Sequence, residues 1–315
     1  MSLPGDAAAG QAAEPVSRQP GPFTVDGPRV RFRRQDVAER LRVTVVGDTH
    51  LFRDDARGEP FQTYSRRMAG AYNQTQHVHK GETTHPQEGF EEVLRQASDD
   101  DSDLFVMVGD IVSFPSEAAV EWVQQRVEAA GIPFIYVAGN HDWHYEGMPG
   151  SSADLRATWT GQRLAPLYQG NDPLMAAYDV KGVRFVAIDD SIYGILPEQL
   201  AFFREQVAGG LPLVLLMHIP LYAPGRGISF GCGHPQWGAD TDRNWQIERR
   251  PRWPATGHSA TTFAFHREVF GAANMLGVFA GHIHHQSLDC VNGVPQFVAH
   301  ANACGGYLTA EFLPL

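Results

Sequence analysis

The chain has 315 residues, of which 43% are hydrophobic and 19% are charged, a composition typical of a globular protein with a sizeable core. Its formal net charge of −11 argues against a general nucleic-acid binder, which would carry a basic face. No run of about 18 apolar residues is present, so no membrane span is expected. The three cysteines form no CxxC pair, which argues against a zinc finger.

The beginning of the chain differs in composition from the rest. Residues 1–21 are rich in Ala, Gly, Pro and Gln, and we expect a disordered N-terminal extension there. Residues 22–315 are expected to form one catalytic domain. As written, the start lacks the charged and apolar regions of a signal peptide, so a cytoplasmic location is the expectation, with a trimmed signal as the alternative.

The first motif follows the first expected core strand. Residues 22–40 alternate weakly and predict an edge strand or arm, and residues 41–46 form a buried apolar run. That run ends in Gly-Asp-Thr-His, which places Asp48 and His50 two positions apart. In an extended segment these side chains share one face, which suits two ligands of one cation.

A long polar segment follows at residues 51–86, and we expect an irregular loop at the active site. Its histidines, His77 and His79, are interpreted as solvated rather than metal-binding. Arg66 and Arg67 are weaker candidates for contact with a substrate phosphate.

The next part of the chain alternates between helix and strand. A helix is expected over 87–98, a strand over 104–108, a helix over 118–130 and a strand over 133–138. This order predicts a parallel sheet, whose ligand sites lie at the carboxyl ends of the strands. The two strands end in Gly-Asp, with Asp110, and in Gly-Asn-His-Asp, with residues 139–142.

The second half continues with loops and strands. Residues 143–172 are predicted to be loop-rich, and residues 175–180 and 183–188 to form a hairpin. A helix is expected over 197–208, followed by a buried strand over 211–217 that ends at His218.

A second long insertion is expected at residues 221–258. It interleaves tryptophans with arginines, a pattern that suits either a cap for an anionic, ring-bearing substrate or a small core within the loop. A helix at 259–271 and a strand at 275–280 follow, and this strand ends in Gly-His-Ile-His-His, residues 281–285. Short antiparallel strands are expected over the remainder, at 286–291, 296–299 and 306–312.

Five expected strand ends therefore carry residues of the kinds that bind metals: Asp48 with His50, Asp110, Asn140 with His141, His218, and His282 with His284. Imidazole and carboxylate ligands suit Zn, Mn, Fe or Ni. Two such ions about 3.5–4 Å apart clamp both oxygens of an in-line phosphoryl displacement. The pattern predicts a dinuclear centre with Asp110 as the bridging carboxylate and a hydroxide held between the ions as the nucleophile.

The order D-x-H, G-D, G-N-H-D, H, G-H-x-H across about residues 41–300 resembles the calcineurin-like metallophosphoesterase family. The resemblance implies an α/β fold, a four-layer αββα sandwich with two central mixed β-sheets, here with long insertions at 51–86 and 221–258. It implies that one ion is held by Asp48, His50, Asp110 and His284, and the other by Asp110, Asn140, His218 and His282. It also implies that His141 orients the phosphate or protonates the leaving oxygen, with Asp142 as its partner.

The resemblance implies a metal-dependent phosphoester hydrolase, with a phosphodiesterase for a small nucleotide-like or glycerophosphodiester-like substrate favoured over a phosphomonoesterase. A non-catalytic metal-binding interaction module on the same fold is the alternative from another class. The expected partner is a small-molecule phosphoester, without a nucleic-acid groove. The candidate substrate contacts are Asn140, His144, His285, Arg226 and Trp237.

Overall fold

The structure is a computed structural model that describes residues 22–238 and 257–315. The expected disordered extension at 1–21 lies outside the described residues, and so does the segment 239–256 of the second insertion with Trp245 and Trp253.

Two six-stranded mixed sheets form the centre of the fold. The first has the order β1 (Phe23–Asp26), β2 (Arg29–Arg34), β14 (Leu308–Pro314), β3 (Leu41–Val46), β6 (Leu104–Val108) and β7 (Phe134–Val137). The second has the order β12 (Ser287–Val291), β13 (Val294–Val298), β11 (Met275–Ala280), β10 (Leu213–Leu216), β9 (Val183–Ile188) and β8 (Met175–Val180).

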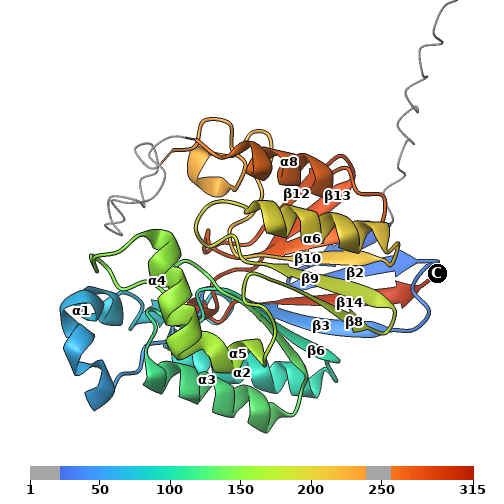
Figure 1. The fold of residues 1–315 in the computed structure, drawn as a ribbon. Coiled ribbons are helices and arrows are strands. Elements are labelled where there is room, and N and C mark those ends of the chain that lie inside the picture. The colour runs from blue at the N-terminus through green and yellow to red at the C-terminus, as the bar shows by residue number, and fades with distance from the viewer. Residues whose placement is uncertain (1–21, 239–256) are drawn as a thin grey trace, which may run out of the picture.

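Helices cover the outer face of each sheet, which confirms the predicted αββα sandwich. Figure 1 shows α2 (Pro86–Asp99), α3 (Glu117–Ala130) and α5 (Ala165–Tyr168) on one side, and α6 (Pro197–Ala208) and α8 (Ala260–Val269) on the other. Between the sheets, the ring of Phe32 lies 6.5 Å from that of Phe279, and the ring of Phe185 lies 6.1 Å from that of Phe312. These buried aromatic contacts join the two sheets through one apolar layer.

The parallel part of the first sheet forms as predicted. β3 pairs with β6 and β6 with β7, both in parallel, with α2 and α3 as the crossover helices. The side chain of Ser116 accepts a hydrogen bond from the backbone N–H of Ala119 at the start of α3, and Gly131, with φ +68°, ends it. The predicted hairpin of β8 and β9 is also confirmed.

Two segments that were predicted to be irregular contain helices instead. The first insertion holds a 3₁₀ helix (Ala56–Phe61), α1 (Gln62–Gly70) and a small hairpin of β4 (Thr75–Gln76) and β5 (Thr83–Thr84). Residues 143–172 contain α4 (Ser152–Trp159), which continues through a π-helical turn into α5. These helices are short, and burial of Met68 and Trp159 against the core stabilises them more than local periodicity does.

The prediction of antiparallel strands at the C-terminus was right for β12 and β13 but incomplete. β13 runs parallel to β11, and β14 crosses to the first sheet, where it lies parallel to β2 and antiparallel to β3. Glu311 of β14 accepts hydrogen bonds from Arg31 and Arg42 of these neighbours, which helps to fix the crossover.

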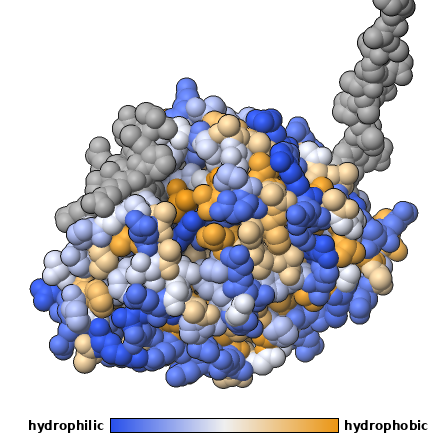
Figure 2. Space-filling view, in the orientation of Figure 1, coloured by the Kyte–Doolittle hydropathy of each residue, from blue (hydrophilic) through white to orange (hydrophobic). Residues whose placement is uncertain are grey.

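Large hydrophobic side chains are mostly inside. Hydrophilic residues cover much of the face in Figure 2, with hydrophobic residues gathered mainly toward its middle. None of the helices in the described residues is long and apolar enough to span a membrane.

Candidate dimetal centre

The predicted ligand residues come together where the two sheets meet. Those that follow β3, β6 and β7 belong to the first sheet, and those that follow β10 and β11 belong to the second. The backbone N–H of His282 donates to both carboxylate oxygens of Asp48, at 3.0 and 2.8 Å, and so ties the two edges together. The structure therefore brings all five motifs into one site, as their strand-end positions predict.

Several residues of the site have a left-handed backbone conformation, which is unusual for residues other than glycine. Positive φ angles are found at Asp48 (55°), His50 (49°), Asp110 (51°), His282 (73°) and His284 (59°). Each costs about 1 kcal/mol or more for a residue with a side chain, and such strain persists where the surroundings enforce it. The expectation that Asp48 and His50 lie in an extended segment is therefore wrong, because the chain turns at each ligand. Hydrogen bonds from Asp48 N–H to Gly109 O and from His50 N–H to Asp110 O hold these turns.

Two glycines allow the loops to approach each other. A Cβ atom at Gly139 would lie 2.2 Å from both the backbone nitrogen and Oδ1 of Asp110. A Cβ atom at Gly109, which has φ +84°, would lie 2.5 Å from Nδ1 of His218. The glycines of the G-D and G-N-H-D motifs are thus required by close packing around Asp110.

Asp110 lies at the centre of the site. Its Oδ2 is 3.2 Å from Nε2 of His218 and 3.9 Å from Nε2 of both His50 and His141, while its Oδ1 accepts the backbone N–H of His141 at 2.7 Å. Burial opposes the charge of this carboxylate, but the neighbouring imidazoles, His218 foremost, hold the pKa of Asp110 well below its usual range. An ionised carboxylate surrounded by imidazoles is suited to bridge two cations.

The other donors are oriented toward this carboxylate and toward each other. The Nδ1–H group of His218 donates to the carbonyl oxygen of Val108 at 2.8 Å, so that Nε2 faces Oδ1 of Asn140 at 3.2 Å. On the other side, Nε2 of His284 is 3.0 Å from Nε2 of His50 and 3.4 Å from Oδ1 of Asp48.

Three clusters result, each with ligand atoms within 4.8 Å of one another: Asp48, His50 and His284; His50, Asp110 and His141; and Asp110, His218 and His282. Such crowded lone-pair donors suit cations placed among them. The buried clusters are therefore consistent with a dimetal site.

Asp142 is buried and accepts hydrogen bonds from the backbone of two loops of the site. Its Oδ1 accepts the backbone N–H of Val112 at 2.8 Å and its Oδ2 that of Gly139 at 2.7 Å. Burial, together with the charge of Asp110, raises the pKa of Asp142 to about 7. Because each oxygen accepts a backbone N–H group, Asp142 helps to hold the two loops in place.

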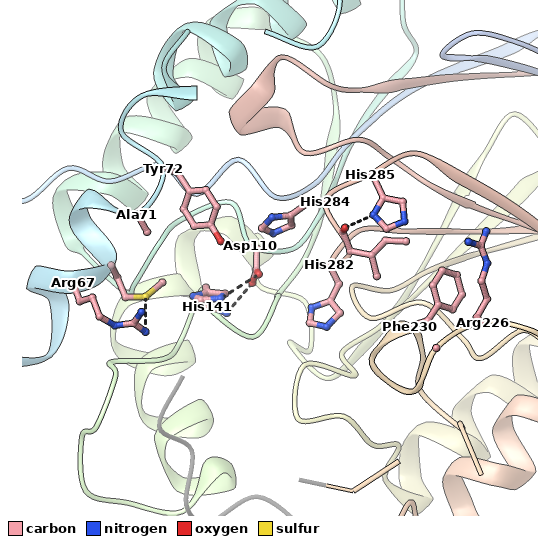
Figure 3. Close-up of a pocket in the computed structure, with 13 residues that line it drawn as sticks. Arg67, Ala71, Tyr72, Asp110, His141, Arg226, Phe230, His282, His284 and His285 are labelled. Atoms are coloured by element: carbon pink, nitrogen blue, oxygen red, sulfur yellow. Dashed lines mark hydrogen bonds and ion pairs between the residues drawn. The ribbon is translucent and has the colours of Figure 1, made fainter. Parts of the chain in front are cut away.

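A cavity of about 570 Å³ opens beside Asp110. Figure 3 shows its two walls: Tyr72 and Arg67 on one side of Asp110, and Phe230 and Arg226 on the other. Arg67 forms an ion pair with the buried carboxylate of Glu146 at 2.5 Å. Arg226 pairs with Asp289 at 2.9 Å and lies over the ring of Phe230 at 4.7 Å.

The cavity contains only some of the predicted substrate contacts. Arg226 and His285 line it, as does His141. His144, Trp237 and Asn140 are buried and are not among the described lining residues, and Oδ1 of Asn140 lies 3.2 Å from Nε2 of His218. The placement of His144 and Trp237 does not support direct contact with a substrate, because packing rather than sequence proximity decides which side chains reach the cavity.

Sequence analysis missed two tyrosines at the site. The ring of Tyr72 stacks on His50, with 3.9 Å between centroids and 14° between planes, and Figure 3 shows its hydroxyl directed toward Asp110. The hydroxyl of Tyr193 lies 3.0 Å from Nε2 of His282. Both tyrosines lie outside the strand-end motifs, and no periodicity or spacing in the sequence marks them.

Comparisons with known proteins agree with this geometry. The family model for calcineurin-like phosphoesterases matches residues 41–286. A probable cyclic nucleotide phosphodiesterase of Psychrobacter sp. (strain PRwf-1) is 42% identical over 144 residues, and the match spans 42% of this chain and only 40% of that relative. The crystal structure of a dimetal phosphatase from Danio rerio, 13% identical, has a TM-score of 0.54 and covers 85% of this chain and 91% of its own, which supports the fold.

Proposed function

The chain belongs to the calcineurin-like phosphoesterase family and is a metal-dependent hydrolase of phosphoester bonds, and we propose that its substrate is a small phosphodiester of the nucleotide-like or glycerophosphodiester-like kind. The complete donor set and the family membership leave no support for the alternative of a non-catalytic module.

The arrangement of the cavity carries the proposal. Each of its two walls places one aromatic ring and one arginine beside Asp110: Tyr72 with Arg67, and Phe230 with Arg226. A phosphodiester carries an organic group on each side of the phosphorus atom, and a two-walled site offers each group a surface. A monoester would use only one wall. The name of the Psychrobacter relative, a probable cyclic nucleotide phosphodiesterase, supports the same class.

We assign one metal ion to Asp48, His50, Asp110 and His284, and the other to Asp110, Asn140, His218 and His282. When bound, the two ions would supply Lewis-acid activation of the phosphoryl group and of the attacking water. Mn, Fe, Zn and Ni all suit these ligand types.

The remaining residues act on the substrate itself. His141 has its backbone anchored on Asp110 and its ring in the cavity wall, where it would orient the phosphate or protonate the leaving oxygen. Arg226 is held by Asp289 but retains further N–H donors for an anionic or polar group of the substrate. Tyr72 and Phe230 would pack against the organic groups.

A direct test compares hydrolysis of a chromogenic phosphodiester with that of the matching monoester, with Mn, Fe, Zn and Ni supplied separately. Diester cleavage should dominate. In Phe230→Ala, the loss of one wall should reduce diester cleavage more than monoester cleavage. Phe202→Ala, on the distant helix α6, should leave the ratio of diester to monoester cleavage unchanged. Dominant monoester cleavage by the unmodified protein would overturn the proposed substrate class while leaving the hydrolase in place.

A further inference from the structure

We propose that Tyr193 is a positioning residue for one of the two metal ions: its hydroxyl fixes the ring of His282 so that this ring presents Nδ1 to the ion shared with Asp110 and His218. The inference rests on the proposed dimetal centre. It assigns a task to a residue outside the ligand motifs and explains why part of the second insertion packs behind the site.

The contact itself selects the nitrogen of His282. The Tyr193 hydroxyl lies 3.0 Å from Nε2, and the two rings meet nearly edge to face, at 80° with 5.3 Å between centroids. A nitrogen engaged with a hydroxyl is not free for a metal, so Nδ1 is the ligand atom. Metal-binding histidines commonly donate their other N–H group to an oxygen acceptor, which fixes the tautomer and the ring orientation. Here we infer that the acceptor is a phenol oxygen.

The turn that carries Tyr193 also holds the second histidine of the same cluster. Oδ1 of Asp190 accepts the backbone N–H groups of His218 and Ile219, both at 3.1 Å. The backbone N–H of Tyr193 donates to the carbonyl oxygen of Asp190 at 2.8 Å, which closes the turn after β9. A single turn that supplies no ligand thus orients His218 through its backbone and His282 through its ring.

The backbone of Tyr193 has an unfavourable conformation, and neighbouring side chains hold it in place. Its φ of +57° is unfavourable for a bulky residue and persists only where the surroundings enforce it. Its ring stacks on Trp237 at 5.2 Å and 13°, and Trp237 stacks on His258 at 4.5 Å and 16°. The Nδ1–H group of His258 donates to the carbonyl oxygen of Tyr193 at 3.0 Å, which also holds the backbone of Tyr193 in place.

This packing gives Trp237 a role other than the predicted substrate contact. Trp237 is 2% exposed, stacks on Tyr193 and is not among the described residues that line the cavity. The second insertion thus contributes Trp237 and His258 to a stack that holds Tyr193 in place, and Tyr193 in turn orients His282 toward one metal ion.

Tyr193→Phe tests the proposal, because it removes the hydroxyl and keeps the stacked ring. The unmodified protein, freed of metal and titrated with Mn or Zn against a competing chelator, should bind two ions in two steps. In Tyr193→Phe, one step should weaken about 10–100-fold, the effect typical of losing such a partner, and the other should remain unchanged. Excess metal should restore turnover, and the unfolding temperature of the metal-free variant should match that of the unmodified protein.

Two further variants sharpen the result. Tyr178→Phe, on the edge strand β8, removes a tyrosine hydroxyl elsewhere and should leave both binding steps unchanged. Trp237→Leu should weaken the same step as Tyr193→Phe, because it removes the stack. Unchanged affinities in Tyr193→Phe, or equal weakening of both steps, would overturn the inference. Failure of the unmodified protein to bind two ions would instead overturn the proposed dimetal centre.

Discussion

The Nε2 atoms of His50 and His284 lie 3.0 Å apart, although 234 positions separate the two residues in the chain. His50 follows β3 of the first sheet, and His284 follows β11 of the second. The candidate ligands are divided between the two sheets, so they come together only where the two sheet edges meet.

Replacement of His141 by alanine should slow turnover about 10²–10⁴-fold, the range for loss of a general acid or base, while both metal ions remain bound. The loss should be larger for substrates with poor leaving groups, because these depend most on a proton donor. Rates on a series of leaving groups, with metal content measured on the same samples, check this. His79→Ala, at an exposed position of the first insertion, is the control. Loss of one ion from His141→Ala would identify His141 as a ligand instead.

Gly139→Ala should disturb Asp110 directly. The added methyl group would lie 2.2 Å from the backbone nitrogen and Oδ1 of Asp110, and a backbone atom has little room to yield. We expect a cost of about 1–3 kcal/mol in the free energy of unfolding, together with weaker metal binding. Gly161→Ala is matched to it, because a methyl group there meets nothing within 4 Å. Normal metal content and stability in Gly139→Ala would contradict the packing described for the site.

Arg226→Ala should raise the KM for a phosphodiester about tenfold and change kcat less, since we propose that the guanidinium binds the substrate away from the reacting atoms. Arg184→Ala is a suitable comparison, because Arg184 also forms an arginine–aspartate pair but on the β8–β9 hairpin. Steady-state kinetics on both variants provide the measurement. An unaltered KM in Arg226→Ala would remove this residue from the substrate site.

Glu311 should make the free energy of unfolding depend on pH in the acid range. It is 6% exposed; its burial raises its pKa, but hydrogen bonds from Arg31 and Arg42 outweigh this and lower the pKa overall. A carboxyl whose folded-state pKa is depressed stabilises the fold above its unfolded pKa, and this contribution is lost as the pH falls through the folded value. Glu311→Gln should therefore cost about 1 kcal/mol at neutral pH, because solvent screens the partly exposed arginines.

Urea unfolding of metal-free protein at several pH values measures this effect. The difference between Glu311→Gln and the unmodified protein should shrink as the pH falls below the usual range of a glutamate. A difference that stays constant across this pH window would show that the ion pairs contribute little.

The strand ends were predictable because a buried strand and the polar residues that follow it are local in sequence. Residues 104–108 and 275–280 are continuous apolar runs, and they form β6 and β11 with the same bounds. Asp110 and His282 then follow within two residues of the strand ends. Local pattern was thus sufficient to find residues that come together in the candidate site.

What could not be predicted depends on contacts between distant segments. The partner strands of β14 are chosen by packing, and its own sequence resembles that of any buried strand. Tyr72 and Tyr193 reach the site through an insertion and a turn whose conformations are set by tertiary contacts. The backbone partners of Asp142 likewise depend on how two loops approach.

The most direct measurement of the central claim is a metal titration that follows hydrolysis and metal content in the same samples. Metal-free protein should be inactive toward a chromogenic phosphodiester, and activity should rise until two ions are bound per chain. Asp110→Asn should bind fewer ions and lose at least about 100-fold in rate. Full activity with one ion or none, or full activity in Asp110→Asn, would contradict a dimetal centre organised around Asp110.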